Sequence, residues 1–423
     1  MNPDFDFFST FVQGLSSIEV AVAVIGFISA AAFAGFWATK FGYYVLPQPR
    51  ESRVSDFLPF NKLLSDGITI RCYNGSLARV FRVEGVDLAF VTDEKVMSML
   101  EARKSWIDGM SDLQVTCRVI TLRERIPLEE ETGDFGNKLL SDIASTWRSN
   151  LDRVYSNQHY IVLSVADRTD SLKDLNYASQ ALIATLSEYG VTTLYESEGS
   201  PAKDSPLSVY SKICSPISKP MPKINGAHLN ELLTSDHIHF TGENGIIKFF
   251  SGDKQLYEVV MGIRSSGDYM DEGMIASLLS IDCELTLLHN IRPIFKPHAR
   301  ALLMQQQRMA TMTSFSSDVV DQYSEVLAAI EDSDTNHQAL TEYAMAVILH
   351  GESKEEIDFG ESEVQRICRL YGVTPVREGW VTQATFFNQF PTYETLPRTY
   401  RYLSRVVATA ISFDKPSEGF SKS

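Results

Sequence analysis

Glycine and lysine residues that stand close together can form a phosphate-binding loop, and this 423-residue chain has two such places. They are Gly351-Glu352-Ser353-Lys354 and the terminal Gly-Phe-Ser-Lys-Ser. Neither has the spacing G-x-x-x-x-G-K-[S/T], in which paired glycines let backbone amides surround a phosphate. The sequence therefore predicts no nucleotide site of this kind and no cofactor-binding residue.

Histidine and acidic side chains could bind a metal, but their spacing here does not build a site. His237 and His239 would point to one face of a strand, without a third ligand at a diagnostic spacing. The run DSDTN at residues 332–336 begins like a calcium loop, yet His337 stands where that loop needs glycine and Tyr343 where it needs glutamate. The hydrolase patterns G-x-S-x-G and H-E-x-x-H are also absent from the sequence. We therefore expect no metal site and no catalytic residue.

The charge of the chain limits the kinds of partner it can bind, and its cysteines indicate the redox compartment. The chain has 38 basic and 54 acidic residues and a net charge of -16, which would repel a phosphate backbone. No basic cluster offsets this field, so we expect no direct nucleic-acid binding. The cysteines are odd in number, scattered and without a C-x-x-C pair, which predicts buried thiols in a reducing compartment; they are Cys72, Cys117, Cys214, Cys283 and Cys368.

An uncharged run of twenty residues, Val20 to Thr39, predicts a transmembrane helix, because a helix of this length is about 30 Å long. A cleaved secretory signal is the alternative, but the residues before the run carry no Lys or Arg. The basic residues Lys40, Arg50 and Arg53 all follow the run, which places the bulk of the chain in the cytoplasm. The expected membrane-anchor residues are Val20, Ile25, Phe27, Phe33, Phe36 and Trp37.

The remaining residues show the same order of predicted elements twice. A hairpin turns at Asn74-Gly75, and helices then alternate with strands up to the tetrapeptide YGVT, which contains Gly190. A second hairpin turns at residues 251–253, and a similar series leads to a second YGVT, which contains Gly372. In each copy the glycine is expected to end a helix in the left-handed conformation and start a strand. The pattern indicates a duplication.

The predicted fold class is α+β, with one amino-terminal transmembrane helix followed by two similar α/β lobes that have mixed or antiparallel sheets. Helices over residues 297–331 and Lys354–Leu370 and a strand over VDLAFV, residues 86–91, belong to this prediction. The expected boundaries are 1–19 for an extracytoplasmic amino terminus, 20–39 for the membrane helix, 40–57 for a linker, 58–220 for the first lobe, 221–244 for a linker, 245–392 for the second lobe and 393–423 for a helix and tail.

The stretch LPFNKLLSDGITIRCYNGSLARVFRVEGVDLAFV, Leu58 to Val91, resembles the amino-terminal domain of the CagE/TrbE/VirB family of type IV secretion and conjugation ATPases. FFSGDKQLYEVVMGI, RALLMQQQRMATMTSF and LYGVTPVREGWVTQATFFNQFP are similar to later parts of that family, so the resemblance covers most of residues 58–413. Where many relatives have Leu-Pro-Gly-Asn, this chain has Phe390-Pro391-Thr392-Tyr393.

The resemblance implies a platform that docks a motor domain to the bacterial inner membrane and to other secretion subunits, with self-association into oligomers. Family members continue into a motor with nucleotide-binding motifs, and residues 393–423 are expected to lead toward such a domain, which this chain lacks. ATP and Mg²⁺ are implied only for that motor. The alternative is an ATP-hydrolysing component whose motor is absent from this chain or supplied by a partner.

Overall fold

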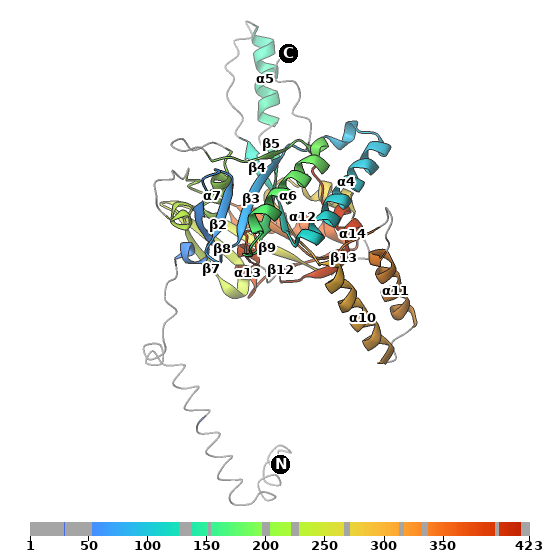
Figure 1. Cartoon of the computed structure of the whole chain (residues 1–423). Helices are drawn as coiled ribbons and strands as arrows, with labels where there is room; N and C mark the ends of the chain where they lie inside the picture. Colours follow the sequence, from blue (N-terminus) through green and yellow to red (C-terminus); the bar gives the residue numbers. More distant parts are fainter. Residues whose placement is uncertain are drawn as a thin grey trace, which may run out of the picture. The chain divides into compact units, whose positions relative to one another are not determined.

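The computed structural model describes residue 29 and residues 53–126, 137–150, 154–196, 204–220, 228–265, 271–312, 317–331, 337–393 and 397–415. Val54–Ser423 forms one compact unit. Its strands join in one 13-stranded sheet (Figure 1), and every named strand pair is antiparallel. The strands are β1 (Phe60–Leu63), β2 (Thr69–Cys72), β3 (Leu77–Val83), β4 (Thr116–Ile126), β5 (Val154–Val165), β6 (Val191–Thr193), β7 (His237–Phe240), β8 (Ile246–Ser251), β9 (Lys254–Ser265), β10 (Glu284–Pro293), β11 (Leu340–Gly351), β12 (Thr374–Arg377) and β13 (Tyr400–Leu403).

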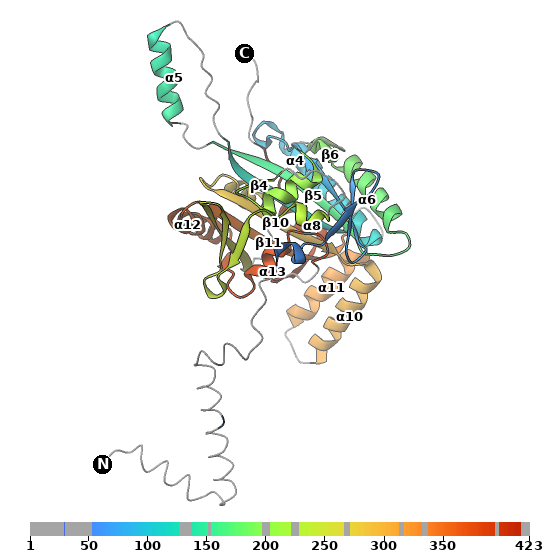
Figure 2. The same ribbon diagram turned by 90° about the vertical axis from the view of Figure 1, so that its left-hand side faces the viewer.

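Helices pack on both faces of this sheet. The α-helices are α4 (Asp93–Leu113), α5 (Lys138–Asn150), α6 (Ser171–Thr185), α7 (Pro206–Cys214), α8 (Leu229–Leu232), α9 (Glu272–Leu278), α10 (Lys296–Met312), α11 (Ser317–Glu331), α12 (Lys354–Leu370), α13 (Thr382–Phe387) and α14 (Ser404–Thr409). Short 3-10 helices are η1 (Val54–Phe57), η2 (Leu88–Phe90), η3 (Ser187–Tyr189) and η4 (Gly242–Asn244). Figure 2 shows α10 and α11 side by side, and the two helices share a small apolar core of their own.

Alternate side chains of the central strands enter two large cores, one on each face of the sheet. In β5, Ile161, Leu163 and Val165 belong to the core that also contains apolar residues of α4, α6, α9, α12 and α14. Tyr160 and Val162 belong to the opposite core, to which α7, α8 and α13 contribute. Because both faces are covered, most side chains in the strand centres are buried, whichever face they point to.

The predicted fold class of two α/β lobes is wrong, because both segments share one sheet and one set of cores. The strand order is β1-β2-β3-β5-β4-β10-β11-β9-β8-β7, with β6 beside β3, β12 beside β9 and β13 beside β11. The order β2-β3-β5-β4 in the first segment is mirrored by β10-β11-β9-β8 in the second. The segments meet where β4 pairs with β10, and we call this pair of strands the seam.

The seam has a physical reason. In two separate lobes, β4 and β10 would each be an unpaired edge with apolar side chains, which exposes both backbone hydrogen-bonding groups and hydrophobic surface. Pairing them from Leu285↔Arg123 to Ile291↔Cys117 removes both edges at once. The two segments therefore merge into one body.

The transmembrane helix of the predicted fold class is not supported either. Among the helices described in residues 53–415, none combines the length and the apolar character needed to cross a bilayer. The predicted span Val20–Thr39, with the anchor residues Val20, Ile25, Phe27, Phe33, Phe36 and Trp37, lies outside the described residues except for Ser29.

Two smaller predictions also differ from the structure. Residues 88–90 form the 3-10 helix η2, where a strand over 86–91 was expected. The single helix expected over 297–331 is two helices, α10 and α11. A salt bridge joins them, in which Arg300 Nε lies 2.7 Å from Glu331 Oε1. The helix predicted over Lys354–Leu370 is confirmed as α12.

Candidate functional site

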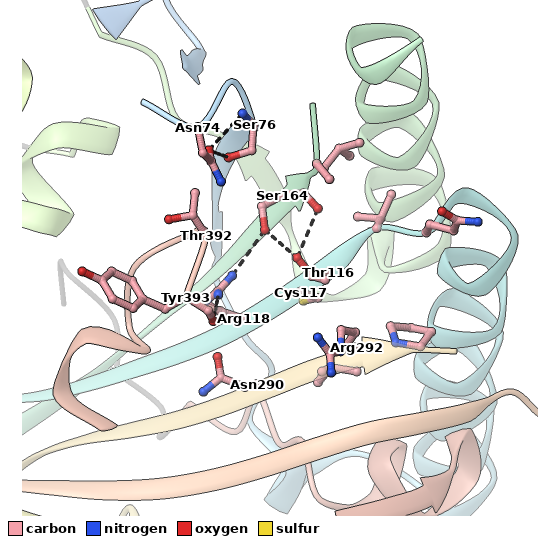
Figure 3. Close-up of a pocket in the computed structure, with 16 residues that line it drawn as sticks. Asn74, Ser76, Thr116, Cys117, Arg118, Ser164, Asn290, Arg292, Thr392 and Tyr393 are labelled. Carbon is pink, nitrogen blue, oxygen red and sulfur yellow. Dashed lines mark hydrogen bonds between the residues drawn. The ribbon is translucent and has the colours of Figure 1, made fainter. Parts of the chain in front are cut away.

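A polar pocket lies on the seam, where strands from both segments meet (Figure 3). Its walls are β4, β10, the residues at the end of β5, the turn between β2 and β3 and the loop at residues 392–393. Its volume is about 190 Å³. We call this cavity the seam pocket.

Arg118 of β4 is the central side chain of the seam pocket. It is only 4% exposed, and it lies on the opposite face of the strand from Cys117 and Val119. Its Nε donates to the carbonyl of Asn388 at 2.9 Å, and its Nη2 donates to the carbonyl of Tyr393 at 3.0 Å. The guanidinium therefore holds the segment after α13 against the sheet.

Asn290 of β10 stands directly opposite Arg118 across the seam. Residues in this position have Cβ atoms about 4.5–5.5 Å apart, so their side chains meet on one face. Asn290 is 5% exposed, and its Oδ1 has no hydrogen-bond partner among the residues that the structure describes. In Figure 3 its amide lies in the pocket, below Arg118.

Arg292 lies two residues further along β10 and lines the same pocket. Its Nε donates to Glu342 Oε2 at 2.8 Å, and its Nη2 contacts the same oxygen. Glu342 is not part of the lining, and among the described residues that line the pocket there is no aspartate or glutamate. Two arginines therefore line the seam pocket, and one of them, Arg292, is paired with a carboxylate outside the lining.

Hydroxyl and amide groups complete the rim. Thr116 and Ser164 are opposite each other on β4 and β5, with their hydroxyl oxygens 2.6 Å apart. Ser164 Oγ also accepts from Arg118 Nη1 at 3.3 Å. Thr392 has φ of 77°, a left-handed conformation that is unfavourable for a β-branched residue. Strained backbone of this kind is often found at binding sites.

A second polar group connects three neighbouring strands at the other end of the seam. Glu258 Oε1 lies 2.8 Å from His350 Nδ1, and His350 Nε2 lies 2.8 Å from Thr286 Oγ1. Burial opposes a charged His350, but the adjacent Glu258 carboxylate outweighs it, so the pKa of His350 is raised. A hydroxyl, an imidazole and a carboxylate in this order resemble a nucleophile, its general base and the group that orients the base. Thr286 is buried beside a cavity of about 60 Å³, which is smaller than the seam pocket.

The positions and backbone angles of the residues predicted to form turns are as follows. Asn74 lines the seam pocket, and its Oδ1 accepts from Ser76 N at 3.1 Å. Gly75 has φ of 85°. Gly190 follows η3 with φ of 66°, and Gly372 follows α12 with φ of 70°. Both YGVT glycines thus lie at helix ends, away from the seam pocket.

The residues considered for other chemistry do not come together. His237 and His239 are exposed on β7, at the edge of the sheet. Ser353 accepts a hydrogen bond from the backbone of Glu356 and caps α12, so the glycine and lysine around it flank a helix start. Residues 332–336 lie outside the described part of the chain. Within the described ranges, no group of three or more metal-ligating side chains occurs.

The five cysteines are free and buried, as predicted for buried thiols. Burial raises the pKa of Cys72 to about 11 and those of Cys283 and Cys368 to about 12. A thiol with such a pKa stays protonated near neutral pH and is a poor nucleophile.

The sequence search did not identify Arg118, Asn290 and Arg292. They belong to different elements and form no short motif. A signal was present, however, because TCRVITL and LTLLHNIRP each place polar side chains in a strand that is otherwise apolar. A buried charge in such a strand is rare without a structural or binding role.

Comparison with protein families identifies the family of the chain. Residues 68–171 match the N-terminal domain of the type IV secretion system ATPase VirB4/TrbE. Residues 202–398 match the CagE, TrbE, VirB family, described as a component of the type IV transporter system. The chain belongs to the CagE/TrbE/VirB family. No curated protein matches it.

Family membership confirms the resemblance seen in the sequence and makes the chain a component of a type IV secretion system. The two matched segments correspond to the two halves that meet at the seam. The first contains β2 to β5, and the second contains β7 to β12. Every residue that lines the seam pocket lies in one of the two matched segments.

Proposed function

We propose that this protein is an interaction platform of a type IV secretion system, which docks a transport ATPase motor to other secretion subunits at the bacterial inner membrane. The observation that carries this proposal is the match of residues 68–171 to the N-terminal domain of a secretion ATPase. The chain would supply position and contacts, and another domain or subunit would hydrolyse ATP. Self-association is part of the proposal, because a platform for a ring-shaped motor repeats around the ring.

Exposed apolar side chains support a role in protein contacts. Leu139, Leu140 and Ile143 lie along α5, and Leu139 is 66% exposed. Trp380, just before α13, is 81% exposed. Large exposed apolar and aromatic side chains are enriched where proteins bind other proteins.

Site-specific photocrosslinking in the native bacterium tests the platform role. A photoreactive amino acid is placed at Leu139 or at Trp380, with Asp253 in the exposed β8–β9 turn as the control position. We expect crosslinks from the first two positions to subunits encoded with the same secretion system, and none from Asp253. If an assembled secretion system gives no crosslink to its own subunits from either apolar position, the platform role is wrong.

The second candidate is a protein that hydrolyses ATP with a partner, and the family description as an ATPase favours it. The two candidates differ in nucleotide affinity. Titration of the full-length chain with Mg-ATP in a calorimeter should show no saturable binding if the chain is a platform. Micromolar affinity, or turnover by the chain alone, would favour the enzyme.

A further inference from the structure

We propose that the hairpin of helices α10 and α11 docks head-to-tail against the hairpin of a second copy of this chain. The acidic outer face of α11 in one copy packs against the basic outer face of α10 in the next copy. This inference deepens the proposed function and rests on its self-association, for which it names the surface.

The two helices of the hairpin carry opposite charge. With histidine counted as neutral, every charged residue of α10 is basic and every charged residue of α11 is acidic. They are Lys296, Arg300 and Arg308 in α10, and Asp318, Asp321, Glu325 and Glu331 in α11. Among the residues that the structure describes, one ion pair joins the two helices, between Arg300 and Glu331. Arg308, Asp321 and Glu325 have no ion-pair partner within the same described ranges.

These unpaired charges lie on the outer side of each helix. Leu303 of α10 and Ile330 of α11 are buried in the small core that the helices share. With 3.6 residues per turn, Arg308 lies about 140° around α10 from Leu303. Asp321 and Glu325 lie about 180° and about 140° around α11 from Ile330. Because the helices face each other through their buried sides, the basic and acidic faces form opposite edges of the hairpin.

Both edges are accessible to another molecule. Arg308, Asp321 and Glu325 are exposed. Figures 1 and 2 both show the hairpin extending beyond the sheet. Exposed charges of this kind attract a surface of opposite charge and repel one of the same charge.

Opposite edges of unlike charge favour a head-to-tail contact over a symmetric one. A two-fold dimer places the same surface of both copies in contact, which here would bring like charges together. A head-to-tail contact pairs the acidic edge of one copy with the basic edge of the next. It also leaves one edge of each kind unused at the two ends, so it can be repeated until a ring closes.

Apolar side chains beside the basic face add to the contact. Met309 and Met312 of α10 are 58% and 84% exposed. Met312 lies about 180° around the helix from Leu303, on the same outer side as Arg308. Methionine adapts its shape to a partner surface, and its burial removes apolar area from water. Charge therefore selects which edges meet, and the methionines strengthen the contact.

Sedimentation velocity of the full-length chain over a range of concentrations measures this association. Helices of 17 and 15 residues are about 22–26 Å long, so the contact is small and the association is weak. We expect assemblies larger than a dimer at low ionic strength. Added salt should dissociate them, because it screens exposed charges.

Charge reversal tests which residues are involved. Arg308→Glu should weaken the association at least about tenfold, since it brings like charges into contact. Asp321→Lys together with Glu325→Lys should weaken it to a similar extent. Arg369→Glu is the control, because it makes the same change at an exposed position of helix α12, and it should stay within about twofold of the unchanged protein.

Mixing the two hairpin variants distinguishes this contact from a general effect of charge. The Arg308→Glu chain has acidic charge on both edges, and the chain with Asp321→Lys and Glu325→Lys has basic charge on both edges. Each variant therefore complements the other but not itself. An equimolar mixture should recover the association of the unchanged protein, which would also show that both variants are folded.

Three results would overturn the inference: a chain that stays monomeric, association that neither hairpin variant weakens, or no recovery in the mixture. An equal loss in Arg369→Glu would mean a diffuse charge effect and would overturn it as well. The platform role is judged separately, because Leu139 and Trp380 lie outside the hairpin. Crosslinks from those two positions to other secretion subunits do not require the hairpin contact.

Discussion

Acid should destabilise this protein through His159, a histidine that the fold keeps neutral. His159 lies on β5, is 1% exposed, and is held at both ring nitrogens. Its Nε2 lies 3.1 Å from the carbonyl of Asp414, which can only accept, so Nε2 carries the proton. Its Nδ1 lies 2.9 Å from the hydroxyl of Thr121 and therefore accepts. Protonation of Nδ1 replaces that acceptor with a second donor in a buried site.

The size of the effect follows from the pKa. Burial lowers the pKa of His159 to about 4, whereas a histidine in the unfolded chain titrates near 6.5. A depressed folded pKa contributes stability that is complete above pH 6.5 and is lost as the pH falls toward about 4. Between pH 7.5 and pH 5, proton binding by the unfolded state alone should lower the free energy of unfolding by about 2 kcal/mol.

Urea unfolding of the full-length chain, followed by tryptophan fluorescence at pH 7.5 and pH 5, measures this loss. His159→Gln keeps a neutral donor and acceptor at the site but cannot titrate, so its loss of stability on acidification should be about 2 kcal/mol smaller than that of the unchanged protein. His239→Gln, on the exposed strand β7, is the control and should keep the full loss. The same pH dependence in His159→Gln and the unchanged protein would refute the account of a neutral buried histidine.

Three other sites give predictions for stability. Arg103 on α4 is buried and makes paired hydrogen bonds of 2.8 and 3.1 Å to Glu272, so Arg103→Met should lower the free energy of unfolding by about 2–3 kcal/mol. Adding Glu272→Gln should recover part of the loss in the same urea measurement, and no recovery would mean that packing rather than charge is responsible. Gly372→Ala should cost about 1–2 kcal/mol through its positive φ alone, because no described residue lies within 4 Å of the added methyl group. Gly245→Ala should cost more than about 3 kcal/mol, since its methyl group would meet a backbone carbonyl at 1.8 Å, and equal midpoints of thermal unfolding for the two variants would contradict this.

Local patterns in the sequence predicted most elements but not how they assemble. The helix over Lys354–Leu370 begins after a serine cap and ends before glycine, so its bounds could be predicted. The hairpin at Asn74-Gly75 is fixed by residues that are adjacent in sequence. The pairing of β4 with β10 joins residues more than 160 positions apart in the sequence. The hydrophobic pattern within one strand does not indicate which other strand it will pair with. For this reason two lobes were predicted where one sheet exists.

The seam pocket could not be predicted for the same reason. Arg118 and Asn290 come from strands that the sequence analysis assigned to different lobes, and they are neighbours only because the seam exists. Motif searches depend on fixed spacing within one segment, which this pair does not have. A useful signal would have been the presence of a charged and an amide side chain in strands that are otherwise apolar.

Stability alone does not account for the polar side chains on the seam. Apolar residues of similar volume at a buried polar pair are often neutral or stabilising, so two central strands could have been joined by hydrophobic contacts. Arg118 has a structural role, because its hydrogen bonds hold the segment after α13 to the sheet. Asn290 has no comparable role, since its buried Oδ1 is bonded to none of the described residues. Hydrogen bonding within the described part of the sheet therefore does not explain why an asparagine stands opposite Arg118.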